Sequence, residues 1–166
     1  MTAGSIRQLL PDADLPLVET LYACARDYWD LAEHGTSTRD LAAGFFTDAP
    51  PDCDPSASLR LGAFQGDRLA GVAELSFGFP SRGDAYLGAM ILADWARGQG
   101  LGRRLLHEVE ALARRQGAQL IYLGVLDSNP KGRAFWLREG FTDTGFSRPH
   151  SGGVAETTIR RLVKPL

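Results

Sequence analysis

The stretch LADWARGQGLGRRLL (residues 92–106) places three glycines and three arginines between two apolar segments. The segment before it, AYLGAMIL (residues 85–92), is typical of a strand, and apolar residues recur at helical spacing from Gly102 to Gln116. Glycine destabilises regular structure, so this cluster indicates that something approaches the main chain closely. The first amides of a helix lack internal partners and carry partial positive charge. The stretch therefore predicts a site for a phosphate or diphosphate group.

Three kinds of ligand use such loops, and the sequence disfavours two of them. A P-loop needs Gly-Lys followed by Ser or Thr, which the chain lacks. The dinucleotide pattern GxGxxG matches at Gly98 and Gly100 but has Arg103 in place of its third glycine, and no acidic residue follows at the distance expected for a ribose contact. Coenzyme A, whose diphosphate joins adenosine to the pantetheine arm, remains.

Two motifs in the second half of the chain carry a resemblance to a known family. RGQGLG (residues 97–102) resembles the Q/R-x-x-G-x-G/A signature of the GNAT N-acyltransferase superfamily, and NPKGRAFWLREGF (residues 129–141) is similar to its N-x-x-A…G-F segment. The specific resemblance covers about residues 85–145. It implies an α/β (α+β) fold, with a mixed, mostly antiparallel sheet, a central splayed pair of parallel strands, and flanking helices. It also implies acetyl transfer from acetyl-CoA to a primary amine of a small molecule or protein, by direct attack in a ternary complex.

The order of apolar runs and breakers fits a single domain over residues 1–166. Strands are expected at 5–10, 59–64, 69–77, 85–92, 120–126 and 156–164. Helices are expected at 11–31, 37–46, 102–116 and 129–140. The proline- and aspartate-rich segment 47–58 predicts a loop.

The resemblance implies roles for the residues that hold the cofactor. Main-chain groups of Met90, Ile91 and Leu92 would pair with the pantetheine arm like an added strand. Amides from Gly98 to Arg103 would hold the diphosphate, and the side chain of Asn129 would contact the arm. The expected cofactor-binding set is completed by Arg97, Gln99, Gly100, Leu101, Gly102, Arg133 and Trp136.

The sequence departs from the family pattern at Trp136. Many members have a tyrosine there, as the general acid for the departing thiolate, and an indole cannot serve as an acid near neutral pH. Trp136 could pack against the cofactor arm or fill the core. Either the thiolate leaves unprotonated, or Tyr86 or Tyr122 donates the proton. The missing tyrosine also leaves open an alternative function, a CoA-binding regulatory module with weak or no catalysis.

Glu74 is the expected general base, because it interrupts the otherwise apolar strand GVAELSF next to the cofactor strand. It would either face the acceptor cleft or point outward from a half-exposed strand. Tyr28, Trp29 and Glu33 are the expected acceptor-binding residues, because aromatic and acidic groups together suit a cationic amine. Residues 1–60 carry ten Asp and Glu against four Arg, which agrees with a cationic acceptor.

The whole-chain composition narrows the remaining possibilities. The formal net charge is -2, so the chain is not expected to bind nucleic acid. No apolar segment approaches the roughly 20 residues of a membrane-spanning helix, and no secretion signal is evident. Two cysteines without a metal-binding pattern predict neither a disulfide framework nor a metal site. We therefore expect a cytoplasmic protein without membrane partners, and a homodimer is possible.

Overall fold

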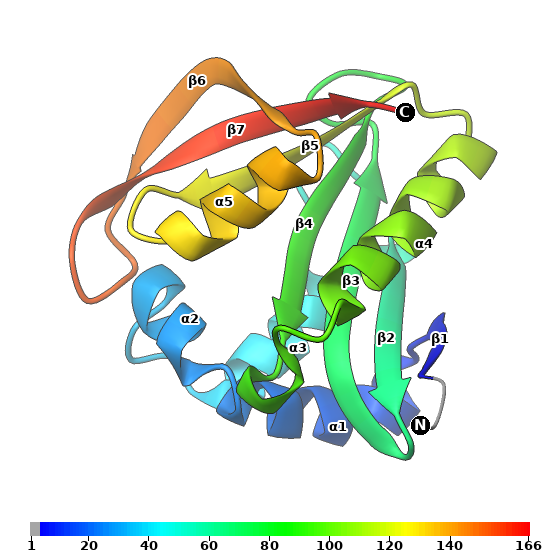
Figure 1. The fold of residues 1–166 in the computed structure, drawn as a ribbon, viewed down its shortest axis with the longest axis vertical. Coiled ribbons are helices and arrows are strands. Elements are labelled where there is room, and N and C mark those ends of the chain that lie inside the picture. The colour runs from blue at the N-terminus through cyan, green and yellow to red at the C-terminus, as the bar shows by residue number, and fades with distance from the viewer. Residues whose placement is uncertain (1–3) are drawn as a thin grey trace.

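The computed structural model describes residues 4–166 and contains one seven-stranded sheet (Figure 1). The strand order is β1-β2-β3-β4-β5-β7-β6. Within the described residues, β4 and β5 are paired in parallel and the other neighbours are antiparallel. The strands are β1 (Ser5–Gln8), β2 (Leu59–Gln65), β3 (Arg68–Phe77), β4 (Ala85–Leu92), β5 (Leu120–Leu126), β6 (Thr142–His150) and β7 (Thr157–Pro165). This arrangement confirms the predicted fold class.

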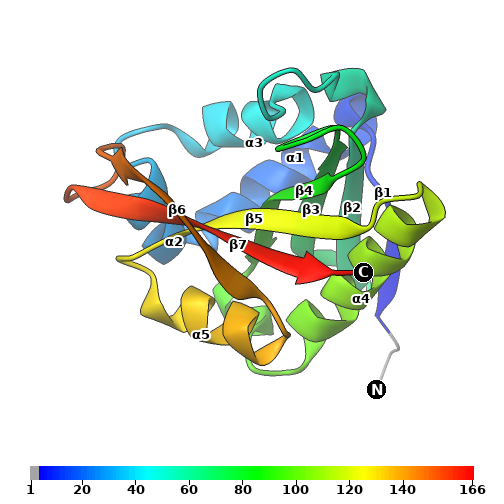
Figure 2. The same ribbon diagram turned by 90° about the horizontal axis from the view of Figure 1, so that it is seen from above.

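Helices cover both faces of the sheet, as Figure 2 shows: α1 and α3 lie on one face, and α4 and α5 on the other. Their bounds are α1 (Pro11–Ala23), α2 (Arg26–Ala32), α3 (Thr38–Thr47), α4 (Leu101–Arg115) and α5 (Pro130–Arg138), with short 3-10 turns at Pro55–Ala57 and Asp94–Ala96. The apolar stripe of α4 packs on the sheet, because Leu105, Leu106 and Val109 are fully buried. The core therefore forms on both sides of β3 and β4, which are buried between helices.

The helix expected over residues 11–31 is divided into α1 and α2. The carbonyl of Cys24 accepts a hydrogen bond from the amide of Asp94 at 2.9 Å, in the loop that precedes α4. The amide of Tyr28 turns instead to the carbonyl of Ala25. The break thus exchanges one helical hydrogen bond for a tertiary contact with the glycine-rich loop.

Strand β6 was not expected from the sequence. Gly145 has a φ of 84° and Pro149 has no amide hydrogen, so both interrupt a regular strand pattern. The strand lies at the sheet edge and all of its residues except His150 are exposed, so it shows no apolar alternation. The hairpin that β6 forms with β7 reaches α2 (Figure 1): His34 donates its amide to the carbonyl of Gly152 at 2.8 Å.

The parallel pair in the middle of the sheet is forked. β4 and β5 pair only from Ala85 to Leu87 on β4, opposite residues 121–123. Beyond that point β4 pairs only with β3 and β5 only with β7. The register jumps from Glu74 opposite Ala89 to Leu75 opposite Leu87, so Gly88 is an extra residue in β4. The bulge lies where the two strands begin to separate.

Candidate functional site

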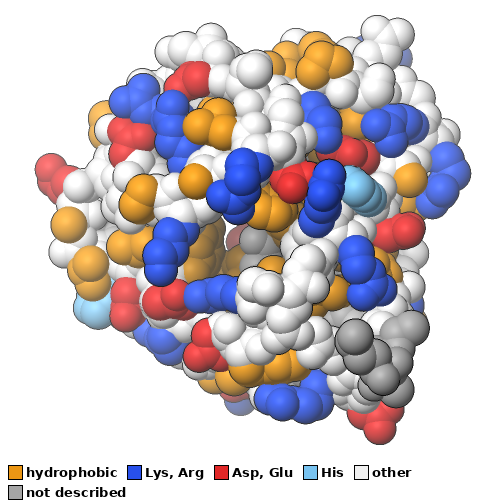
Figure 3. Space-filling model, in the orientation of Figure 1, with side chains coloured by type: hydrophobic (Ala, Val, Ile, Leu, Met, Phe, Trp, Pro, Cys, Tyr) orange, Lys and Arg blue, Asp and Glu red, His pale blue; other side chains and the backbone are white. Residues whose placement is uncertain are grey.

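A cleft of about 1470 Å³ opens at the fork between β4 and β5. Its walls come from α2, α3, β4, β5, the start of α4, α5, and the β6–β7 hairpin. In Figure 3 the hollow lies near the middle of the face, with several Lys and Arg side chains around it. The volume exceeds the roughly 300–1,000 Å³ of a usual small-molecule pocket, so the cleft has room for a large cofactor and a second molecule.

The three glycines at the N-terminal end of α4 serve two different purposes. Gly98 and Gly100 have φ values of 73° and 79°, a left-handed conformation that favours glycine. Gly102 is instead packed close to Leu92 and Phe135, where an added Cβ would lie at 3.4–3.5 Å. Within residues 4–166, the amides from Gly98 to Arg103 donate no hydrogen bond to the protein. They converge at a helix N-terminus beside the cleft, which is a suitable arrangement for an anion.

The side chains of Arg97 and Gln99 are held within the protein. Arg97 donates to both carboxylate oxygens of Asp27, at 2.5 and 3.0 Å, and to the carbonyl of Leu92 at 3.1 and 3.3 Å. Hydrogen bonding to this guanidinium lowers the pKa of Asp27 below its usual value. Gln99 donates to the carbonyl of Trp95 at 3.0 Å. Arg97 therefore offers the cleft chiefly its main chain, and Gln99, which was also expected to bind the cofactor, does not line the cleft.

The other two arginines of the expected cofactor-binding set differ in position. Arg103 lines the cleft and lies 3.5 Å from Glu139. Arg133 does not line it, because its guanidinium is paired with Asp143 at 3.5 Å and Asp127 at 3.9 Å. The sequence could not reveal this orientation, since it depends on a carboxylate from β6.

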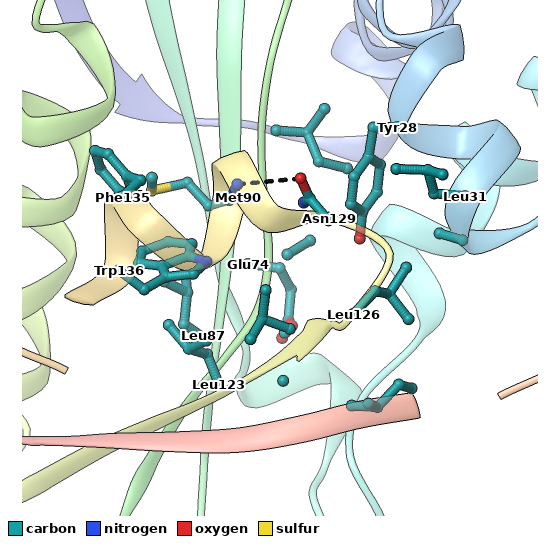
Figure 4. A pocket seen from close by; sticks show the side chains of 18 of the residues that line it. Tyr28, Leu31, Glu74, Leu87, Met90, Leu123, Leu126, Asn129, Phe135 and Trp136 are labelled. Atoms are coloured by element: carbon teal, nitrogen blue, oxygen red, sulfur yellow. Dashed lines mark hydrogen bonds between the residues drawn. The ribbon is translucent and has the colours of Figure 1, made fainter. Parts of the chain in front are cut away.

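Helix α5 and its N-cap present the side chains of Asn129, Phe135 and Trp136 to the cleft (Figure 4). The Asn129 side-chain oxygen accepts from the amide of Gly132 at 3.1 Å and caps the helix. An added Cβ at Gly132 would collide with Asn129, so glycine is required for this close packing. Trp136 is half-buried and packs edge-on against Phe135 and Phe141, with ring centroids 4.9 and 5.5 Å apart. Trp136 thus lines the cleft and also packs against the core.

Glu74 lies inside the cleft, between Trp136 on one side and Tyr28 on the other (Figure 4). Its carboxylate is buried and accepts a hydrogen bond from the Ser76 hydroxyl. Burial raises the pKa of Glu74 above its usual value, and the hydrogen bond from Ser76 opposes that rise. An added Cβ at Gly88 would lie 2.1 Å from Oε2 of Glu74, so the bulge glycine makes room for the carboxylate.

Among the two tyrosines considered as acids, only Tyr86 lines the cleft. Burial raises the pKa of Tyr86, partly offset by the positive charges of Arg161 and Arg148. Its phenol thus remains protonated at neutral pH. Tyr122 lies on the neighbouring strand β5 outside the cleft.

The three expected acceptor-binding residues line the same cleft. Tyr28 packs edge-on against Trp29 at 5.1 Å, and burial raises the pKa of Tyr28 to about 12. The indole nitrogen of Trp29 is buried with no hydrogen-bond partner among residues 4–166. Glu33 is exposed at the end of α2, where it lines the mouth of the cleft.

The sequence did not indicate five titratable residues that line the cleft on α3, its C-cap and the β6–β7 hairpin. Two acidic residues come from α3 and its C-cap, and three basic residues come from the β6–β7 hairpin: Asp40, Asp48, Arg148, His150 and Arg161. A signal was present only for the acids, in the surplus of Asp and Glu in residues 1–60. The basic residues lie in or beside a segment whose strand was itself missed.

A sequence model of the acetyltransferase (GNAT) family matches residues 19–141, well over half of the chain. The chain belongs to the GNAT acetyltransferase family. This GNAT assignment implies acyl transfer from an acyl-CoA to an amine.

Solved structures support the GNAT fold over the whole length. An acetyltransferase from Thermus thermophilus has a TM-score of 0.74 at 24% identity, with 99% of this chain and 97% of that chain covered. A ribosomal-protein-alanine N-acetyltransferase from Brucella melitensis gives 0.76 at 21% identity, covering 98% and 99%. A GCN5-related N-acetyltransferase from Kribbella flavida gives 0.74 at 20% identity, covering 99% and 98%. No curated protein matches the sequence.

The described residues offer neither a membrane-spanning helix nor a cluster of metal ligands. None of the helices in residues 4–166 has the length and apolar character needed to cross a membrane. The same residues contain no group of three or more His, Cys, Asp or Glu side chains placed to hold a metal ion.

Proposed function

We propose that the protein is an N-acetyltransferase that uses acetyl-CoA to acetylate a primary amine, by direct attack while both substrates are bound. The observation that carries this proposal is the buried carboxylate of Glu74, seated against the Gly88 bulge at the point where β4 and β5 separate. There a proton acceptor lies beside the unpaired edge of β4. The same edge leads to the amides from Gly98 to Arg103, which donate no hydrogen bond within residues 4–166.

The residues present fit coenzyme A. The edge of β4 from Gly88 to Leu92 has no partner on the β5 side, so Met90 and Ile91 can pair with the amide groups of a pantetheine arm. The carbonyl of Leu92 is already bound by Arg97 and contributes less. The amides from Gly98 to Arg103 would hold the diphosphate. Asn129 has its side-chain NH₂ group left to donate, because its oxygen caps α5.

Acetyl-CoA supplies an activated thioester carbonyl when it is bound. Glu74 would take the proton from the attacking amine as the new C–N bond forms, directly or through a water molecule. A main-chain amide of β4 would donate to the carbonyl oxygen as negative charge develops there. When the C–S bond breaks, the electron pair leaves with sulfur, and Tyr86 would return a proton to that sulfur. Trp136 would bound the space beside the cofactor arm.

The pH dependence tests the role of Glu74. A protonated carboxyl cannot accept a proton, so kcat/KM should fall as the pH drops through the raised pKa of Glu74. Glu74→Gln should reduce the rate by about 10²–10⁴-fold, mainly at pH values above the raised pKa of Glu74 and below the pKa of the amine, because more of the amine is already neutral at high pH. The measurement is thiol release from acetyl-CoA over a panel of amines and pH values. An unchanged rate and profile in the variant would remove Glu74 as the base.

The alternative of a regulatory module rests on Trp136, which replaces the tyrosine of many relatives. Thermal unfolding with acetyl-CoA, NAD and ATP separates the possibilities, because a ligand that binds the folded state raises its stability. Stabilisation by acetyl-CoA without thiol release on any amine favours the module. Stabilisation by NAD or ATP alone contradicts both functions.

A further inference from the structure

At the end of the cleft next to α2 and the β6–β7 hairpin, here called the acceptor end, two arginines have no acidic partner among residues 4–166. Arg148 of β6 and Arg161 of β7 line the cleft, and neither forms an ion pair with a residue in the range 4–166. The adjacent Arg160 shows the contrast, since it binds Asp127 at 2.7 Å outside the cleft. The positive charge of the first two residues is therefore available to a ligand.

The guanidinium of Arg161 is held in place by aromatic rings. Its central carbon lies 4.1 Å from the ring centroid of Phe146 and 5.0 Å from that of Phe79. Phe79 in turn packs edge-on against Tyr86, with centroids 5.1 Å apart. Stacking fixes the plane of the guanidinium but uses none of its N–H donors. A guanidinium that is ordered and has free N–H donors is suited to bidentate binding of a carboxylate.

The main chain leaves space next to the guanidinium of Arg161. Arg161 lies opposite Gly124 in the register of β7 with β5. An added Cβ at Gly124 would lie 3.2 Å from the hydroxyl of Tyr86 and 3.0 Å from Ile159. Because paired residues of antiparallel strands share a face of the sheet, the missing side chain leaves Arg161 open toward Tyr86.

The hairpin that carries the arginines is fixed against α2. His150 contacts the carbonyl of Ala32 at 2.6 Å through Nε2, and Val154 donates its amide to the carbonyl of Asp30 at 2.9 Å. Arg148 lies two residues before His150 on β6. These contacts hold Arg148 at the wall of the cleft rather than on a free loop.

The other side of the same space is acidic. Glu33 from α2, and Asp40 and Asp48 from α3 and its C-cap, line the cleft together with Glu74. The acceptor end thus has negative groups on the helical wall and positive groups on the hairpin wall. A molecule with both charges matches this pattern better than a simple amine, which would meet unopposed positive charge.

Resting on the proposed function, we infer that the acceptor is a free amino acid, with its amine directed to Glu74 and its carboxylate bound by Arg161 and Arg148. In a free amino acid the amine and the carboxylate are attached to the same carbon atom, which fixes the distance between the two groups. A peptide N-terminus has an amide in place of this carboxylate and would leave the arginines unmatched.

The test compares L-alanine, L-leucine, L-methionine and L-phenylalanine with the amide of each. Binding is measured by calorimetry in the presence of CoA, and acetylation by thiol release with acetyl-CoA. At least one acid should bind more tightly than its amide, by about 10- to 100-fold, as expected for charge-assisted hydrogen bonds. The amide has the amine of lower pKa, so more of it is neutral at the assay pH. A preference for the acid therefore cannot arise from a more reactive amine.

Variants connect the preference to the arginines. Arg161→Gln should weaken binding of the acid about 10- to 100-fold and leave binding of the amide nearly unchanged. Arg161→Lys, which keeps the charge without the guanidinium, should give a smaller loss, and Arg148→Ala should also reduce the preference. Arg115→Ala removes an exposed arginine of α4 outside the cleft and serves as the matched control. Melting temperatures of all variants show whether they are folded.

The two readouts separate the inference from the proposed function. Equal binding of acids and amides, no binding of either, or equal loss of both in Arg161→Gln overturns the carboxylate site. Arginine-dependent binding of an acid without thiol release contradicts acetyl transfer but supports the site. Thiol release with a peptide that has an N-terminal alanine, but with none of the free amino acids, supports acetyl transfer and overturns the carboxylate site.

Discussion

Replacing Gly88 with alanine isolates the contribution of the β4 bulge to the position of the base. The new Cβ would lie 2.1 Å from Oε2 of Glu74, whereas real Cβ contacts essentially never fall below 3.0 Å. The carboxylate must therefore move by about 0.9 Å or more. A displacement of about 1 Å at a reacting group costs on the order of 10²-fold in rate. We expect kcat to fall about 100-fold, with little change in the affinity for acetyl-CoA.

Added volume in a packed region also lowers the stability, by about 1–3 kcal/mol. Gly62→Ala provides the matched control, because its Cβ would collide with Leu9 and Leu69 at 2.6 and 2.8 Å in β2, away from the cleft. This control should lose comparable stability and keep its kcat. The assays are steady-state thiol release and thermal unfolding.

A double-mutant cycle decides whether the bulge acts through the carboxylate. Glu74→Ala removes the group that the new methyl displaces, so Gly88→Ala should cost little further activity in that background. If the two losses multiply in full, the effect of the bulge on rate does not pass through Glu74 and the reasoning is refuted.

Three other substitutions test separate parts of the structure. Gly100→Ala places a Cβ on a residue with a φ of 79°, which costs about 1–2 kcal/mol and should weaken acetyl-CoA binding in calorimetry; unchanged affinity would separate the loop from the diphosphate. Tyr86→Phe should lower kcat for thiol release by about 10²-fold or more. An unchanged kcat would mean that the thiolate leaves without a proton from Tyr86. Asp14→Asn removes the buried partner of Arg7 and should cost about 1–3 kcal/mol at neutral pH. Because hydrogen bonding to Arg7 lowers the pKa of Asp14, this stability is present above the unfolded pKa of 3.8 and is lost as the pH falls through the folded pKa; unfolding curves of the two proteins should therefore converge in acid.

The sequence was most informative where a short segment determines its own conformation. Gly98 and Gly100 have the left-handed geometry that a glycine-rich entry to a helix implies, and the strand and helix around them lie close to the expected bounds. A lone carboxylate in an apolar strand drew attention to Glu74, which lines the cleft, although its burial depends on a bulge in the next strand. The spacing of residues within β4 cannot show that Gly88 is the extra one, because the register is set by β3.

Features that depend on distant partners could not be predicted. The break between α1 and α2 requires the amide of Asp94 to reach Cys24. The orientation of Arg133 away from the cleft depends on Asp143. The availability of Arg161 arises because no carboxylate among residues 4–166 lies within ion-pair distance of it. Strand β6 is an exposed edge with a glycine and a proline, so it lacks the periodic signal on which such predictions rest.

The forked sheet has a consequence for how such a protein can change during evolution. On the proposed function, the cofactor depends on the start of α4 and on α5, whereas the acceptor depends on α2, α3 and the β6–β7 hairpin, which meet the cofactor only at the gap. Substitutions in the hairpin or in α3 can therefore change which amine is bound without altering the residues that bind the thioester. New acceptor specificities can thus evolve on these peripheral elements while the acyl-transfer reaction stays the same.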